Sequence, residues 1–346
     1  MVSKLRLKLP QLFAVLLFGV GAVFALLPAE QAGAVESGTC QTVSRAVRLA
    51  PLLPKNQTMV GDLCLPNEWA EGAHRVDVLV HGGSYNRTYW DYPVDYPNYS
   101  YVERTLQAGR ATFAYDRLGA GDSSRPLSPL ATVQAEAYIL HQLVGWLESD
   151  YDDVNIVGHS FGSLTALEST ALYKDVDTIV LTGLLHSTGP GATQLALTAT
   201  PAEFDPQFAG QGYDLGYLTT GQGQRGPVFY GGITDQAVID YDEANKDVIA
   251  SGLLAALGTV TLPPPLNISS QVKADVLVIS GEFDNMFCGI NLDCTDQAAV
   301  TALETPFYPK AASVEVQTVA DTGHNLALHP SAGASFNAIN QWIETH

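Results

Sequence analysis

The sequence predicts an α/β protein built on one mainly parallel sheet, and two observations support this fold class. From residue 75 onward, short apolar runs alternate with stretches of helical spacing, which is typical of βαβ units. The 346 residues are 46% apolar and 15% charged, with glycine and proline spread along the chain. This composition excludes a disordered or fibrous chain and is sufficient for one large core.

Two groups of segments are predicted to form strands. Segments 42–49 and 58–65 precede the alternating region and are expected to pair as an antiparallel hairpin. The apolar runs that follow lie at 76–80, 111–115, 154–157, 178–181, 276–279 and 314–319. Helical spacing is present at 132–147, 162–173 and 335–343.

The alternation breaks between His186 and Gln271. About 85 residues there separate two predicted strands that a crossover of ordinary length would join. The segment contains six glycines between 210 and 226, a helical stretch near 235–257, and three consecutive prolines at 263–265. We interpret it as an inserted cap over an active site, and a surface elaboration without contact to substrate is the alternative.

The first 34 residues have the pattern of a cleaved signal peptide. Basic residues precede an apolar run at 12–27, and Ala32-Gly33-Ala34 is a small-residue cleavage pattern. The run of about 16 residues is shorter than the roughly 20 that a spanning helix needs. We expect a secreted protein without a stable membrane anchor, and a retained anchor is the alternative.

The predicted organisation therefore has four segments. The signal peptide occupies 1–34, and the mature chain begins at Val35. One core is formed by 35–185 and 272–346, and the cap occupies 186–271.

The charge of the chain restricts its partners. The formal net charge is −19, and it becomes −21 once the three basic residues and one acidic residue of 1–34 are removed. Nucleic acids are bound by clustered Lys and Arg, so this field would repel DNA and RNA. We expect a small-molecule partner and no nucleic acid.

The four cysteines predict two disulfides in an exported chain, for which three connectivities exist. Proximity in the sequence favours Cys40 with Cys64 and Cys288 with Cys294. Their spacings of 24 and 6 residues do not match zinc ligation, so we expect no metal. The second bridge would stiffen the turn that follows Asp284.

Ser160 is the predicted nucleophile. The apolar strand at 154–157 continues directly into Gly158-His159-Ser160-Phe161-Gly162, after which helical spacing begins. A G-x-S-x-G sequence between a strand and a helix forms a sharp turn that exposes the serine hydroxyl. The helix N-terminus that follows places positive potential near a developing oxyanion.

His324 is the predicted base, because a serine hydroxyl needs an adjacent base to take its proton. It follows the last predicted strand, in a loop at the carboxyl edge of the sheet. His329, five residues later, is the nearest alternative, and His186 is an alternative on the cap side. His159 and His81 lie too close to the nucleophile turn and to the strand at 76–80 to act as the base.

Asp284 is the predicted acid that fixes the tautomer of His324 and stabilises its charged form. It ends a tight turn after the buried strand at 276–279. The resulting chain order of serine, aspartate and histidine differs from that of other triad folds. Glu282, Asp293 and Asp296 are nearby alternatives.

Two backbone N–H groups are predicted to stabilise the oxyanion. One belongs to Phe161, directly after the nucleophile, and the other comes from the His-Gly-Gly-Ser turn that follows the strand at 76–80. We favour Gly83 over Ser84 for the second. The turn Asp116-Arg117-Leu118-Gly119-Ala120-Gly121-Asp122-Ser123 lacks the lysine of a phosphate loop and is interpreted as structural, with Asp116 and Arg117 expected to form a local hydrogen-bonded or ionic lock.

Seven aromatic residues are concentrated between 85 and 101. Their large apolar faces and polar tips would suit binding of an acyl or aromatic group near the oxyanion turn. Packing of this loop onto the core is the equally favoured alternative. The residues are Tyr85, Tyr89, Trp90, Tyr92, Tyr96, Tyr99 and Tyr101.

Together, these motifs resemble the α/β-hydrolase superfamily, in its cap-bearing branch, over residues 76–343. The resemblance implies an eight-stranded, mostly parallel sheet flanked by helices, and cleavage of esters, lactones or amides. It also implies the roles given above to Ser160, Asp284 and His324. Relatives that resemble haloalkane dehalogenases or epoxide hydrolases place an aspartate where this chain has Ser160.

We therefore expect a secreted carboxylic-ester hydrolase that acts through an acyl-enzyme and needs no cofactor. Its substrate would be a small or medium ester or lactone, apolar or aromatic in character. An amide or peptide hydrolase with the same triad is one alternative. A ligand-binding protein that has kept the fold without turnover is another.

Overall fold

The computed structural model describes residues 37–346, so the signal-peptide prediction for 1–34 lies outside the described residues. An eight-stranded sheet forms its centre, in the order β1-β2-β4-β3-β5-β6-β10-β11. β1 pairs antiparallel with β2, β2 pairs antiparallel with β4, and all other pairs are parallel. The strands are β1 (Gly38–Val47), β2 (Gln57–Pro66), β3 (Arg75–Val80), β4 (Ala111–Tyr115), β5 (Asp153–His159), β6 (Thr178–Thr182), β10 (Asp275–Gly281) and β11 (Val314–Val319).

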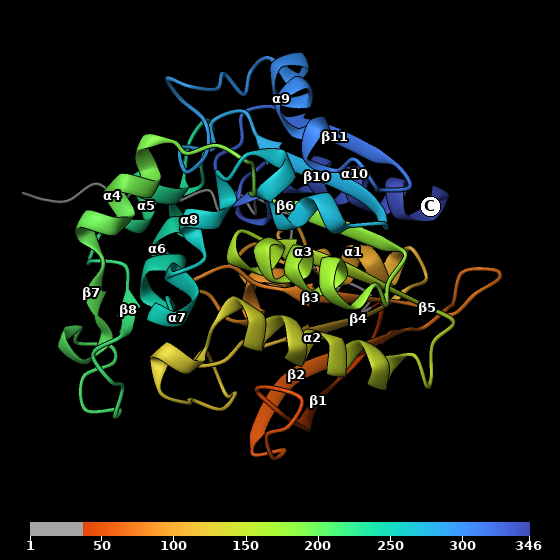
Figure 1. The fold of residues 1–346 in the computed structure, drawn as a ribbon, viewed down its shortest axis with the longest axis horizontal. Helices are drawn as coiled ribbons and strands as arrows, with labels where there is room; N and C mark the ends of the chain where they lie inside the picture. Colours follow the sequence, from red (N-terminus) through yellow and green to blue (C-terminus); the bar gives the residue numbers. More distant parts are fainter. Residues whose placement is uncertain (1–36) are drawn as a thin grey trace, which may run out of the picture. The chain divides into compact units, whose positions relative to one another are not determined.

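The fold class and the N-terminal hairpin are thus confirmed. The central strands are apolar along their whole length because helices cover both faces of a parallel sheet; every residue of β4 and β6 is buried. Helix α2 (Val133–Leu147) packs against α3 (Phe161–Tyr173), and α1 (Tyr101–Gln107) packs against α10 (Ala332–Thr345) (Figure 1).

Two helices of the core were not predicted. Helix α1 has seven residues and α9 (Gln297–Glu304) has eight, which is too short for a clear helical period. The start of α1 nevertheless has a readable signal, because Ser100 and Glu103 are spaced as in a capping box. The Ser100 hydroxyl accepts a hydrogen bond from the Glu103 N–H at 2.9 Å.

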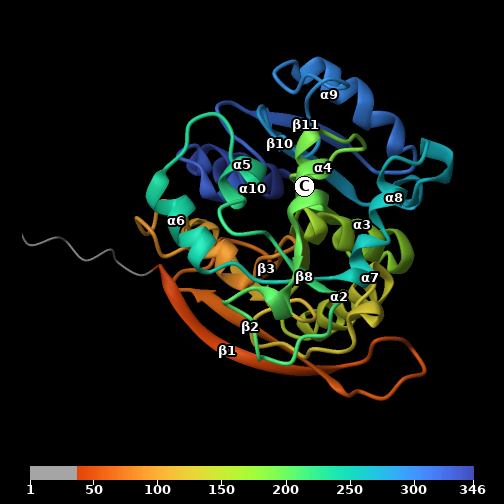
Figure 2. The same cartoon turned by 90° about the vertical axis from the view of Figure 1, so that its left-hand side faces the viewer.

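The insertion, defined here as residues 186–271, lies between β6 and β10. It contains a small antiparallel sheet of β7 (Thr200–Pro201), β8 (Tyr217–Thr219) and β9 (Ile249–Ala250). Its elements gather on one side of the core, at the left of Figure 1 and facing the viewer in Figure 2. Its α-helices are α4 (Pro190–Thr198), α5 (Arg225–Phe229), α6 (Gln236–Ala244), α7 (Ser251–Leu254) and α8 (Leu257–Val260).

The expectation of one helical stretch near 235–257 is wrong. Helix α6 ends at Ala244, and the chain is extended again at β9. Between them, the backbone pairs with the core instead of continuing the helix: the Asp247 N–H donates to Ser84 O at 2.9 Å, and the Ser84 N–H donates to Val248 O at 3.2 Å. A long-range pairing has therefore overridden the local helical pattern.

Both predicted disulfides are present. Cys40 and Cys64 face each other on β1 and β2, and Cys288 and Cys294 close a loop after β10. No free cysteine occurs among residues 37–346. Within the same residues, no helix combines the length and the apolar character needed to cross a membrane.

Candidate active site

Ser160 lies at the turn between β5 and α3, with φ 52° and ψ −117°. This left-handed backbone is rare for a residue with a side chain and costs on the order of 1–3 kcal/mol. The turn is held by the Ser160 N–H, which donates to Thr182 O at 2.8 Å. A Cβ on Gly162 would lie 2.0 Å from Val80 O, so only glycine allows the turn to approach β3 this closely.

His324 and Asp284 form a buried pair. The Nδ1 atom of His324 lies 3.0 Å from each carboxylate oxygen of Asp284, and their side chains are 1% and 0% exposed. The carboxylate also accepts the N–H of Met286 at 3.0 Å and the hydroxyl of Ser280 at 3.3 Å. With Nδ1–H donating to Asp284, the Nε2 atom of His324 is left as the basic nitrogen.

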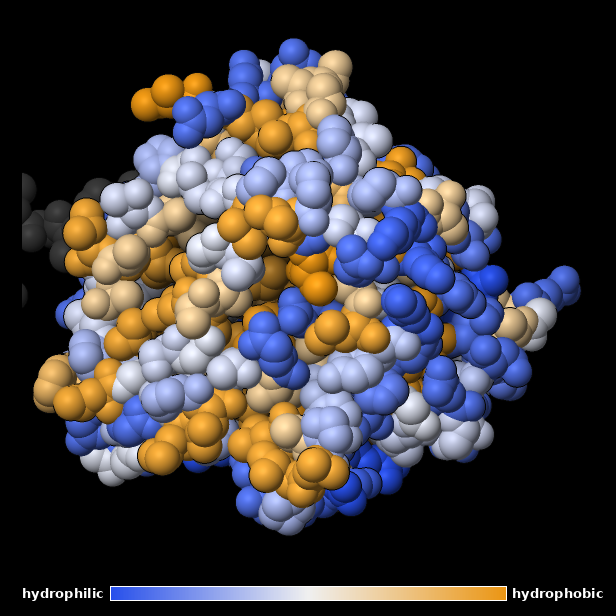
Figure 3. Space-filling model, in the orientation of Figure 1, coloured by the Kyte–Doolittle hydropathy of each residue, from blue (hydrophilic) through white to orange (hydrophobic). Residues whose placement is uncertain are grey.

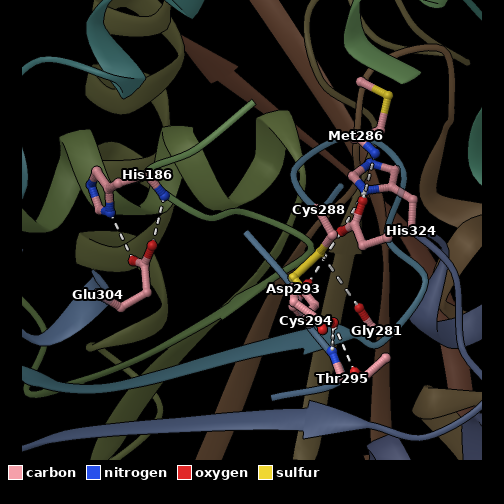
Figure 4. The surroundings of a disulfide bond; sticks show 11 residues. His186, Gly281, Met286, Cys288, Asp293, Cys294, Thr295, Glu304 and His324 are labelled. Atoms are coloured by element: carbon pink, nitrogen blue, oxygen red, sulfur yellow. Dashed lines mark hydrogen bonds and ion pairs between the residues drawn. A yellow bond between two sulfur atoms is a disulfide. The ribbon is translucent and has the colours of Figure 1, made fainter. Parts of the chain in front are cut away.

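The predicted acid and the predicted base belong to loops at one edge of the sheet. Asp284 follows β10 and His324 follows β11, while Ser160 follows β5. Because these strands are parallel, their carboxyl ends meet at the same edge, where sites of open α/β sheets form. Figure 4 shows Met286 beside the His324 ring, above the Cys288–Cys294 disulfide.

His329 and His81, which the sequence left as other candidates, hold backbone groups. The Nε2 atom of His329 accepts the N–H of Gly323 at 3.0 Å, and burial lowers the pKa of this imidazole. The Nε2 atom of His81 accepts the N–H of Arg117 at 3.0 Å. Burial, together with the nearby Arg117 charge, lowers the pKa of His81 to about 3. Both rings are therefore neutral structural groups.

His186 and His159 are also engaged elsewhere. The Nδ1 atom of His186 lies 2.7 Å from Glu304, well apart from His324 in Figure 4. The His159 ring stacks on Tyr89 with centroids 4.4 Å apart, and burial lowers the pKa of His159 well below its usual value. The carboxylate partner of His186 is thus Glu304, away from the nucleophile turn, and His159 has no carboxylate partner among the described residues.

The alternative acids have other partners as well. Glu282 accepts the N–H of Asp321 at 3.1 Å, Asp293 accepts the Thr295 N–H at 3.0 Å, and Asp296 caps α9. Among residues 37–346, the carboxylate bonded to His324 is that of Asp284.

The oxyanion turn packs directly against the nucleophile turn. A Cβ on Gly82 would lie 3.2 Å from Ser160 Cβ, and one on Gly83 would lie 3.0 Å from the Phe161 ring. The Ser84 N–H already donates to Val248 O, whereas the Gly83 N–H has no acceptor among the described residues. The N–H of Gly83 is therefore available as a donor, whereas that of Ser84 is already engaged.

These groups converge on a cavity of about 330 Å³. Gly83, Ser160, Phe161 and His324 line it, and Asp284 lies behind His324. In this structure Ser160 Oγ makes no hydrogen bond with His324. Apolar side chains of the insertion form much of the wall, including Ala192, Leu195, Leu218, Ile249, Leu254 and Val260.

The aromatic loop is mainly a packing element. Of the seven aromatic residues, Tyr85 lines the cavity. Tyr89, Trp90 and Tyr101 are at most 1% exposed and contact one another edge to face, whereas Tyr96 is 43% exposed. The packing alternative therefore fits most of the loop, and the substrate-binding interpretation is limited to Tyr85.

The turn at 116–123 is also structural. The Asp116 carboxylate accepts the Arg87 N–H at 2.8 Å and pairs with the Arg87 guanidinium. Arg117 donates from Nη1 to His81 O at 3.3 Å and lies 3.7 Å from Glu136. Within the turn, the Asp116 carboxylate accepts the Asp122 N–H at 2.9 Å. The charged groups of Asp116 and Arg117 pair with Arg87 and Glu136 rather than with each other, so an ionic lock between Asp116 and Arg117 is not formed. In residues 37–346, no group of three or more His, Cys, Asp or Glu side chains could hold a metal ion.

Sequence reasoning missed the contact between the insertion and the histidine loop. The His324 N–H donates to Phe229 O at 2.9 Å, and the Phe229 ring stacks on the imidazole with centroids 5.6 Å apart. Gly232 pairs with Thr322 in a short bridge. No sequence motif marks this segment, because its contact with the histidine loop arises only where the folded insertion packs against the core.

A sequence model described as the alpha/beta hydrolase family matches residues 78–336. The chain belongs to the alpha/beta hydrolase family. No match was found among curated proteins.

Solved structures share the fold of this hydrolase at low identity. DcsB, in complex with its substrate analogue, is 18% identical with a TM-score of 0.57, over 89% of this chain and 99% of that chain. An esterase from Exiguobacterium antarcticum is 13% identical with a TM-score of 0.56, over 83% and 96%. A putative aryl esterase from Burkholderia cenocepacia is 15% identical with a TM-score of 0.56, over 84% and 96%.

Proposed function

We propose that this chain is a secreted serine esterase that hydrolyses small or medium carboxylic esters or lactones. The observation that carries the proposal is the convergence of Ser160, His324 and the N–H donors of Gly83 and Phe161 on one apolar cavity. The Asp284–His324 pair behind the cavity supports it, because a serine needs an oriented base.

In the acylation step, Ser160 Oγ attacks the ester carbonyl carbon while His324 Nε2 takes the hydroxyl proton. Asp284 holds the imidazole by Nδ1–H and stabilises its positive charge. The carbonyl oxygen becomes an oxyanion that accepts hydrogen bonds from the N–H groups of Gly83 and Phe161. The tetrahedral intermediate then breaks the bond to the alkoxide, which leaves as an alcohol with the proton from His324.

Deacylation repeats the same proton transfers with water. His324 Nε2 takes a proton from water as its oxygen attacks the acyl carbon of the Ser160 ester. The second tetrahedral intermediate expels Ser160 Oγ, to which His324 returns the proton, and the carboxylic acid leaves. No cofactor takes part in these steps.

The cavity supports an apolar acyl group of limited size. Its volume of about 330 Å³ is at the lower end of the roughly 300–1,000 Å³ that ligand sites occupy. The insertion also exposes large apolar side chains, such as Leu197, Phe204 and Leu266. Figure 3 shows apolar side chains gathered over the region where the insertion lies in Figure 1. We propose that the insertion acts as a cap that selects apolar substrates.

Secretion is supported by the two disulfides, which persist mainly in oxidising compartments. The predicted signal peptide at 1–34 would direct the export.

A fluorophosphonate probe tests the nucleophile. We expect the folded mature protein to be labelled once, and Ser160→Ala to be neither labelled nor active. Ser187→Ala is the matched control because Ser187 also lines the cavity, so this variant should be labelled like the wild type. Equal labelling of wild type and Ser160→Ala would show that the nucleophile lies elsewhere.

Substrate panels separate ester hydrolysis from the alternatives. p-Nitrophenyl esters of increasing acyl length should be hydrolysed faster than the matching anilides. Preferential cleavage of anilides would indicate an amide hydrolase. Tight binding of apolar esters without turnover or labelling would indicate a ligand-binding protein.

A further inference from the structure

Ser84 has an unusual conformation beside the oxyanion donor. Its φ is 60°, in the left-handed region that favours glycine, and its side chain is buried. A serine in this conformation persists only where its surroundings hold it. The insertion provides that hold on both sides of the backbone, because Ser84 O accepts the Asp247 N–H and the Ser84 N–H donates to Val248 O.

Arg225 completes the hold on Ser84. It begins α5 and is 0% exposed. Its Nη1 donates to the Ser84 hydroxyl at 3.0 Å and to Ser84 O at 3.2 Å. Its guanidinium carbon lies 4.1 Å from the centre of the Tyr85 ring. One side chain of the insertion therefore contacts Ser84, the last residue of the oxyanion turn, and Tyr85, which follows it.

Asp242 of α6 fixes the guanidinium from the other side. Its Oδ1 lies 2.8 Å from Arg225 Nη2, and its side chain is 2% exposed. Its Oδ2 accepts the hydroxyls of Tyr85 at 3.0 Å and of Tyr230 at 2.9 Å. Asn325, next to His324, donates in turn to the Tyr85 hydroxyl.

The same short helix also contacts the base. Helix α5 begins at Arg225 and ends at Phe229, whose carbonyl accepts the His324 N–H at 2.9 Å. The position of Arg225 is therefore fixed relative to both the oxyanion turn and the catalytic histidine. The buried Arg225–Asp242 ion pair does not by itself indicate that Arg225 stabilises the fold, because the cost of desolvating both charges offsets much of their attraction.

We propose that Arg225 is a positioning residue that sets the oxyanion donor from within the insertion. Gly82 packs against Ser160 on one side of Gly83, and Arg225 clamps Ser84 on the other. Gly83 is then left with little freedom, and its N–H is held where the oxyanion forms. The proposal rests on the proposed serine esterase function and extends it, because the insertion then contributes to rate as well as to substrate choice.

Arg225→Met tests this role by removing the donors while keeping a long side chain. We expect kcat per titrated active site to fall by roughly 10- to 100-fold with little change in KM, since only transition-state stabilisation is lost. The inhibition constant of a trifluoromethyl ketone, which forms a tetrahedral adduct, should rise by a similar factor. That of the matching alcohol, which forms no adduct, should stay constant. Arg225→Lys, which keeps one charged donor, should recover part of kcat.

Arg110→Met is the matched control for loss of a buried ion pair. Arg110 lies 3.1 Å from Asp77 near the start of β3 and β4, away from the cavity. This variant should unfold more easily yet keep the wild-type kcat per titrated site. In Arg225→Met the Asp242 carboxylate stays buried without its ion-pair partner. Adding Asp242→Asn removes this charge, so the double variant should regain stability while kcat stays low.

Two results would overturn the proposal. One is wild-type kcat per titrated site in Arg225→Met, and the other is recovery of kcat together with stability in the double variant. If the wild type itself is not labelled and does not turn over esters, the esterase function fails and this role of Arg225 fails with it. Labelling and turnover of the wild type distinguish the two cases.

Discussion

The two halves of the cavity are held in different ways. On the core side, Ser160, Asp284 and His324 each follow a strand of the parallel sheet, and the sheet sets their positions. On the side of the insertion, Ser84 is held by Arg225, Asp247 and other residues far away in the sequence. Under the proposed mechanism, residues placed by the sheet carry the proton transfers, whereas a long-range contact with the insertion sets the oxyanion turn.

Replacement of the acid should give the largest effect on the core side. Asp284→Asn keeps the shape of the side chain but loses its charge, so His324 would take the wrong tautomer and its charged form would lose its partner. We expect kcat to fall by roughly 10⁴-fold, as in the equivalent change of a well-studied triad, with a small effect on KM. Steady-state kinetics with an apolar ester measure both values.

Glu282→Gln is the matched control for this prediction. Glu282 lies two residues earlier on the same turn and bonds to the Asp321 N–H rather than to His324. It should stay near wild-type kcat. If Glu282→Gln lost its activity while Asp284→Asn kept the wild-type kcat, the acid would be Glu282, and the serine mechanism would remain intact.

Sequence patterns predict the core side well, for a physical reason. Strands buried on both faces are continuous apolar runs, so the turns that carry Ser160 and Asp284 could be located directly after them. The G-x-S-x-G motif singles out Ser160, whereas the choice of Asp284 over Glu282 depends on the contact with His324 in the folded chain. The break in the helix near 235–257 could not, because it depends on pairing between Asp247 and Ser84. Arg225 has no local motif, since its role arises only where α5 meets the oxyanion turn.

The core side should also be the acid-sensitive side. His81 is buried and neutral in the folded chain, with a pKa of about 3 against 6.5 for an unperturbed histidine. Between these values the unfolded chain binds the extra proton, so the free energy of unfolding falls as the pH decreases below 6.5. From pH 6.5 to 5 this one group should cost about 1.6 kcal/mol.

Urea unfolding at a series of pH values tests this dependence. His81→Gln can still accept the Arg117 N–H through its amide oxygen but cannot titrate. It should show a shallower loss of stability between pH 6.5 and 5 than the wild type. An unchanged slope in His81→Gln would contradict the assignment of the acid sensitivity to this ring.

The smallest expected effect concerns substrate choice on the side of the insertion. Ala192 lies on α4 and lines the cavity, so Ala192→Phe would fill space next to the acyl group. We expect kcat/KM for an octanoyl ester to fall by roughly 10-fold relative to an acetyl ester, since pocket contacts of this size are worth about 1–3 kcal/mol. Leu197→Phe is the control on the same helix. Because Leu197 is 81% exposed, this substitution should leave the ratio unchanged.

If both variants kept the wild-type ratio, the insertion would be a surface elaboration with respect to substrate choice. Its contacts with Ser84, through Arg225, and with His324, through Phe229, would then be its remaining links to the site.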